Sequence, residues 1–230
     1  MLDAYDAPWD VIAGIAALAL LVAFAWVKLA ARAEPAWRRP ASWLVLTVIL
    51  FELLLGANGV LRQWDRRPPP MLALMVTLFA GLLFASRRLG PKFAVLPYAV
   101  LIGLQVFRFP LELVMHRAAA TGIMPIAMSY SGYNFDVLSG ISAGVVGWLA
   151  QHGQAPRWLL WAWNVLGSVL LLIIIAISLA ASPVTHAFGY DQMNTWVAYP
   201  PFVLLPGILV PAAAFGHLVL WRKLWDDSDG

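Results

Sequence analysis

Seven long apolar segments alternate with short polar stretches along the chain. They occupy residues 9–30, 42–61, 71–85, 93–116, 135–150, 158–181 and 202–220. A helix needs roughly 20 mostly apolar residues to cross a bilayer, so each segment is a candidate span. The third and fifth segments are short, and we expect them to tilt or to thin the bilayer locally. The pattern predicts an all-α bundle of seven transmembrane helices that forms one domain over residues 1–230.

Composition supports a membrane protein. Hydrophobic residues make up 62% of the chain and charged residues 12%, with a mean hydropathy of +0.78. Soluble domains carry about 25% charged residues, and disordered chains are still more polar. The chain has no cysteine, which excludes disulfides, thiolate nucleophiles and iron–sulfur clusters.

The distribution of lysine and arginine predicts the orientation. Ten of these residues fall in loops on one side, namely Lys28, Arg32, Arg38, Arg39, Arg87, Arg88, Lys92, Arg157, Arg222 and Lys223. Four fall on the other side, namely Arg62, Arg66, Arg67 and Arg117, together with the acidic start Asp3, Asp6 and Asp10. Cytoplasmic loops are enriched in these cations. We therefore expect the N-terminus outside and the C-terminus in the cytoplasm, although the basic loop after residue 61 runs against this. The net charge of +3 reflects topology and indicates no nucleic-acid partner.

The fourth segment carries a polar stripe. Gln105, Arg108, Glu112 and His116 follow one another at steps of three, four and four residues, which places them within roughly an 80° arc of a helix. Such groups avoid lipid and face the bundle interior or a wet cavity. Two interpretations stay open: an Arg108–Glu112 ion pair that only specifies packing, or a functional pocket. Pro110 removes one helix hydrogen bond within the stripe.

The second segment adds a carboxylate at Glu52. Gly56, Gly59 and Gln63 lie on the same helical face, and the glycines would let a neighbouring helix approach closely. By residue count Glu52 lies at a depth similar to that of Arg108. We therefore hypothesise that Arg108 bridges Glu52 and Glu112. The alternative is a Glu52 side chain that burial keeps neutral.

Two connections are longer than hairpins require, residues 117–134 and 182–201. The first is almost uncharged, which predicts that it lies on the membrane or folds back into the bundle. Near its end, Asn134 or Asp136 is suited to cap the next helix. In the functional alternative, Asp136 orients His116 for acid–base work, and Tyr133 lines the mouth of the same pocket.

Two of these stretches resemble an uncharacterised family of bacterial polytopic membrane proteins. The first is Phe107-Arg-Phe-Pro-Leu-Glu-Leu-Val-Met-His, and the second contains Ser131-Gly-Tyr-Asn-Phe-Asp. They match an FRxPLELxxH … SGxNFD pattern. The resemblance implies residence in a bacterial cytoplasmic membrane and names no activity.

The candidate site residues suggest three functions. In the first, a pocket on the extracytoplasmic side binds, or binds and converts, a lipid or other hydrophobic small molecule. Its proposed catalytic residues are Glu112, His116 and Asp136, and its ligand-binding residues are Glu52, Gln105, Arg108, Tyr133 and Asn134. In the second, Glu52, Arg108 and Glu112 form the relay of a proton- or ion-coupled transporter or channel. In the third, the chain is a non-catalytic subunit that contacts another membrane protein.

We expect no metal and no cofactor. The histidines lack the HxxxH and HExxH spacings typical of metal sites. Retinal would need a lysine within a span, and Lys223 lies at a helix edge.

Overall fold

The computed structural model describes residues 4–227, and every regular element in that range is helical. The α-helices are α1 (Trp9–Ala33), α2 (Arg38–Ala57), α3 (Pro70–Ala94), α4 (Tyr98–Gly103), α5 (Arg108–Ala120), α6 (Val137–Gln151), α7 (Arg157–Ala180) and α8 (Val210–Asp226). The 3-10 helices are η1 (Ala4–Asp6), η2 (Pro35–Trp37), η3 (Val60–Arg62), η4 (Leu104–Phe107), η5 (Ile126–Met128), η6 (Tyr190–Gln192) and η7 (Trp196–Ala198), and η8 (Leu205–Leu209) is a π-helical turn.

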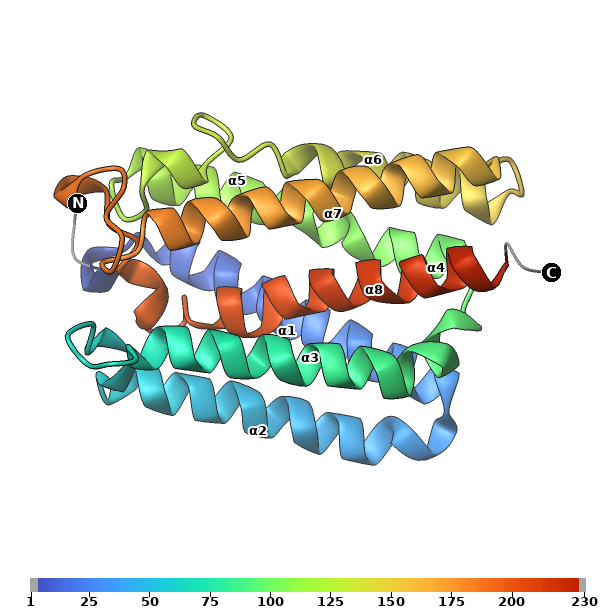
Figure 1. Ribbon diagram of the computed structural model, residues 1–230, viewed down its shortest axis with the longest axis horizontal. Coiled ribbons are helices and arrows are strands. Elements are labelled where there is room, and N and C mark those ends of the chain that lie inside the picture. The colour runs from blue at the N-terminus through green and yellow to red at the C-terminus, as the bar shows by residue number, and fades with distance from the viewer. Residues whose placement is uncertain (1–3, 228–230) are drawn as a thin grey trace.

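The long helices lie side by side along one axis (Figure 1). In that view α2 and α3 form one side of the bundle, α1 and α8 run through its middle, and α5, α6 and α7 form the other side. The packing agrees, since α8 contacts α3 and α7, α1 contacts α2 and α5, and α6 contacts α4, α5 and α7. We call the end where α1 begins the N-terminal end, and the end where α8 stops the C-terminal end.

Six helical segments within residues 4–227 are long and apolar enough to cross a membrane, a pattern typical of a multi-pass membrane protein. The fifth expected span is α6, which is apolar but has only 15 residues. Its shortness agrees with the sequence. The third expected span is not short, because α3 has 25 residues and runs to Ala94 instead of stopping at residue 85. Lysine and arginine are good helix formers, so this helix continues past its apolar run through Arg87 and Lys92.

The expected fourth span begins later and is not a continuous α-helix. Residues 93 and 94 end α3 and residues 95–97 connect it to α4, so the span consists of α4, the 3-10 turn η4 and α5. Pro110 has no N–H to donate to the carbonyl of Val106, which explains why regular α-helical bonding is interrupted one turn earlier. The second span also differs, since it ends at Ala57, before Gly59 at φ 72°. Glycine adopts that left-handed conformation without a steric penalty.

Most basic residues lie at one of the two ends of the bundle. The ten lysine and arginine residues expected on one side lie on helix segments or turns at the C-terminal end, and the other four lie at the N-terminal end (Figure 1). Arg108 is the fifteenth of these cations and lies inside the bundle, with 1% of its surface exposed.

Two long segments cover the N-terminal end. The connection between α5 and α6 folds back into the bundle, the second of the two arrangements expected, and buries Ile123, Met124 and Met128. The segment between α7 and η8 buries Trp196 and Phe202. The two segments are joined where the backbone N–H of residue 126 donates to the side chain of residue 192. This cover closes the end of the bundle above the buried polar groups.

Candidate functional site

A buried ion pair joins α5 to the start of α6. The guanidinium of Arg108 donates from Nε to Oδ2 of Asp136 at 2.7 Å and from Nη2 to Oδ1 of the same carboxylate. The two side chains are 1% and 6% exposed. Arg108 is the eleventh residue of a 23-residue apolar segment, so the pair lies near the middle of that segment. The hypothesis that Arg108 bridges Glu52 and Glu112 is therefore wrong, because its fork is occupied by a carboxylate from the next helix.

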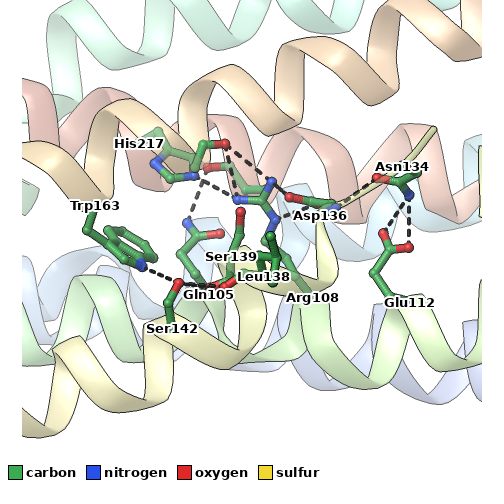
Figure 2. A network of polar contacts seen from close by, with 12 residues as sticks. Gln105, Arg108, Glu112, Asn134, Asp136, Leu138, Ser139, Ser142, Trp163 and His217 are labelled. Carbon is green, nitrogen blue, oxygen red and sulfur yellow. Dashed lines mark hydrogen bonds and ion pairs between the residues drawn. The ribbon is translucent and has the colours of Figure 1, made fainter. Parts of the chain in front are cut away.

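The remaining donors of Arg108 reach α7 and α8. Nη1 lies 2.8 Å from Nε2 of His217, and both Nη atoms donate to the carbonyl of Gly167. A guanidinium can only donate, so Nε2 of His217 accepts. Its Nδ1 then carries the proton and donates to Oδ1 of Asn164 at 2.7 Å. Figure 2 shows the guanidinium of Arg108 among these groups. One arginine therefore links four helices of the bundle.

Glycines bring these helices close enough for the pair to form. A Cβ at Gly140 would overlap the backbone of Phe109 and lie 2.9 Å from the carbonyl carbon of Arg108. About two turns further along α6, Gly147 lies against the backbone of Gly103. A Cβ at Gly167 would overlap the ring of His217. Small residues at a helix interface permit this separation.

Glu112 forms a second buried contact, one turn along α5 from Arg108. Its two carboxylate oxygens accept from Nδ2 of Asn134 at 2.9 and 2.8 Å. The same amide nitrogen donates to the carbonyl of Met128. Oδ1 of Asn134 accepts the backbone N–H of Asp136 (Figure 2). Asn134 thus ties the folded-back segment to α5. Neither Asn134 nor Asp136 caps α6 as expected. The helix has no side-chain cap hydrogen bond, and the carboxylate of Asp136 bonds Arg108 instead.

His116 lies apart from the ion pair. Its Nδ1 is 3.0 Å from Oγ of Ser129 and 3.1 Å from Oγ of Ser131, and its ring stacks on Tyr130. The expectation that Asp136 orients His116 is wrong, since both oxygens of that carboxylate face Arg108.

The other expected ligand-binding residues are scattered. Gln105 is fully buried and donates to the carbonyl of Ala213 at 3.2 Å. Glu52 is fully buried on α2 and faces η8 instead of Arg108. Tyr133 is 60% exposed and stacks on Phe188. The structure therefore brings together Arg108 and Asp136, and separately Glu112 and Asn134, but not the full expected set.

An apolar groove lies between α3 and α7. It has a volume of about 350 Å³ and is floored by Leu205, Pro206 and Val210 of the η8–α8 region. Its walls include Phe79 and Ile175, and its polar positions are Trp64, Ser178, Ser182 and Asn194. Two further cavities lie at the C-terminal end, one beside Tyr98 and one beside Trp26. None of the eight expected site residues lines any of these three hollows. The side chains of the Arg108 network are instead buried against one another, and the apolar groove lies elsewhere in the bundle.

Sequence reasoning missed two members of the network. His217 lies near the end of the expected span 202–220, whereas α8 continues to Asp226 and leaves His217 inside the bundle. Asn164 is a lone polar residue inside an apolar run, a signal that could have marked it. Among residues 4–227 no group of three or more acidic or histidine side chains is arranged to hold a metal ion.

Chemically, the Arg108 network suits fixation of helices more than proton transfer. Each charged atom of the pair already has a fixed partner, and removing one partner of a buried pair leaves an uncompensated charge. We interpret the network as the element that sets the register of α5, α6, α7 and α8.

Replacing Asn134 with aspartate tests the second contact. The change puts a carboxylate where the amide donated to Glu112, and we expect it to lower the free energy of unfolding by about 1–3 kcal/mol. The double variant Asn134→Asp/Glu112→Gln restores a donor–acceptor pair and should regain most of the loss. Unfolding in mixed micelles measures both. Equal stability of Asn134→Asp and the parent would contradict the contact.

Comparison of the chain with protein-family models, with curated proteins and with solved structures found no match. The resemblance to bacterial polytopic proteins therefore stays a prediction.

Proposed function

We propose that this protein binds a single-chain amphiphile, a lipid or a lipid-like small molecule, in the groove between α3 and α7. The observation that carries the proposal is the polar end of an otherwise apolar groove. Ligand sites typically measure about 300–1,000 Å³ and combine apolar walls with a few polar groups that fix orientation. The groove, at about 350 Å³, has this construction.

The polar end contains an acceptor without a donor. Asn194 is 3% exposed, and its Nδ2 donates to Oγ of Ser178 at 2.7 Å. Its Oδ1 is buried and has no hydrogen-bond partner among the residues that the structure describes. Buried polar atoms are nearly always paired, so a ligand hydroxyl or amide would satisfy this oxygen once the Asn194 side chain turns toward the groove.

The polar and apolar parts of the groove are arranged in the same order as the head group and chain of a membrane lipid. Its polar residues lie by the last turn of α7, near the N-terminal end, and its apolar walls run inward to Ile174 and Phe79. Val76 and Leu179, at its edge, are 69% and 47% exposed, so the groove opens toward the side of the bundle where lipid lies. An amphiphile can therefore enter laterally, with its head near the surface and its chain in the hydrocarbon.

The proposal is binding without chemical conversion. Asp136, one of the expected acid–base residues, is occupied by Arg108, and Glu112 and His116 do not line the groove. We further propose that the protein resides in a bacterial cytoplasmic membrane with its N-terminal end outside. The excess of lysine and arginine at the C-terminal end supports that orientation.

A bulky residue in the groove tests the proposal. Ile175→Trp fills the groove, and we expect at least a tenfold loss of bound amphiphile, or about 1.4 kcal/mol. Native mass spectrometry of the purified protein, supplemented with oleic acid or a lysophospholipid, measures the bound fraction. Ile173→Trp is the matched control, because Ile173 is exposed on the same helix and does not line the groove.

Unchanged binding in Ile175→Trp, or equal loss in both variants, would contradict a site in the groove. Stable co-purification of another membrane protein in place of any amphiphile would favour the non-catalytic subunit instead.

A further inference from the structure

Glu52 is a buried carboxyl group that the proposed amphiphile site does not use. It is fully buried on α2, five residues before the end of that helix. Neither of its oxygens has a hydrogen-bond partner among residues 4–227. The carboxyl group lies directly on Gly207, where any Cβ would overlap it.

The backbone that faces Glu52 offers acceptors and lacks free donors. Gly207 is the middle residue of the π-helical turn η8, and its N–H already donates to the carbonyl of Val203 at 3.0 Å. Pro206 and Pro211 have no N–H, so Pro211 leaves a carbonyl of the preceding turn without its helical donor. A carboxylate needs donors, whereas a carboxylic acid brings a donor of its own. The turn therefore complements the protonated group.

No counter-charge faces Glu52 from the elements packed against it. On α1 the charged residues are at the two ends, Asp10 and Lys28 being the nearest on either side. The turn η8 has no ionisable side chain. In the segment between α7 and η8, the ring of Tyr199 packs against the guanidinium of Arg62. The guanidinium carbon is 4.6 Å from the ring centroid. An ionised Glu52 would thus be a buried charge without compensation.

We propose that Glu52 is a proton-binding site of the membrane-spanning region. The carboxylate takes up one proton from solvent to become a carboxylic acid, and its O–H donates to a carbonyl of the η8–α8 turn. Loss of that proton places a negative charge against carbonyl oxygens and separates α2 from η8. The site stands by itself, because Arg108 and Glu112 have other partners and form no relay with it.

Infrared spectroscopy of the protein in lipid nanodiscs tests the proposal. The chain has three glutamates, Glu34, Glu52 and Glu112. If the unaltered protein is labelled with carboxyl-¹³C glutamate, a carboxylic-acid band that shifts with the label must come from one of these three residues. We expect such a band at neutral pH, shifted by the label and lost in Glu52→Gln. Glu34→Gln is the matched control, since Glu34 is a surface residue bonded to Lys92, and Glu112→Gln accounts for the other buried group.

The proposal is overturned if the labelled protein shows no label-sensitive carboxylic-acid band at neutral pH. This measurement uses the unaltered protein and does not depend on the folding of any variant. It is equally overturned by a band that survives in Glu52→Gln and disappears in Glu112→Gln. Amphiphile binding is measured separately with the groove variants, so failure of either idea leaves the other standing.

Discussion

Replacing Arg108 with methionine is expected to lower the free energy of unfolding by about 3–5 kcal/mol. Methionine fills much of the volume but leaves the carboxylate of Asp136 buried without its counter-ion, and breaking a buried pair in this way costs about that much. Nε2 of His217 and the carbonyl of Gly167 also lose their donor. Unfolding of the purified protein in mixed micelles, together with its thermal midpoint, measures the loss.

The double variant Arg108→Met/Asp136→Leu separates the ion pair from packing. Replacing both partners by apolar residues is often neutral, so we expect it to recover at least half of the loss. Full recovery is not expected, because His217 stays without its donor. If Arg108→Met is as stable as the parent, the network does not hold the helices together.

The second large effect is expected from Gly140→Ala. An added Cβ would overlap the backbone of Phe109, and backbone cannot move aside as a flexible side chain can. The substitution forces α6 away from α5 and lengthens the Arg108–Asp136 contact, so we expect a loss of about 3 kcal/mol, the upper part of the range for overpacking.

Gly144→Ala is the matched control on the same helix. A Cβ there meets nothing closer than a side-chain methyl of Val106 at 4.0 Å. Alanine is the better helix former, so this variant should be at least as stable as the parent. Equal losses in the two variants would contradict the close approach of α6 to α5 as the cause, because the added Cβ of Gly144→Ala meets no backbone atom.

The network and the groove have separate roles in this account. Arg108 and Asp136 set the positions of four helices, and the groove uses the space that α3 and α7 leave between them. Met128 connects the two regions, since its side chain lines the groove and its carbonyl accepts from Asn134. A variant that destabilises the network is therefore expected to disturb the groove, whereas Ile175→Trp should leave the network intact.

The polar stripe shows how far sequence periodicity reaches. It predicted that Gln105, Arg108, Glu112 and His116 avoid lipid; the first three are buried and His116 is partly buried. It could not name their partners, because periodicity defines a face of one helix and says nothing of which helix covers it. Asp136 was recognised as a candidate, yet its partner was expected to be His116 and is Arg108.

By itself the sequence determined the helical membrane class, the approximate spans, the segregation of basic residues and the burial of the charged stripe. These follow from local quantities, namely apolar length, charge spacing and helical period. Only the tertiary structure decided which charges pair, where space remains and which polar atoms lack a partner. Those outcomes depend on how closely two backbones approach, which is set by contacts such as Gly140 against Phe109 between residues distant in the chain.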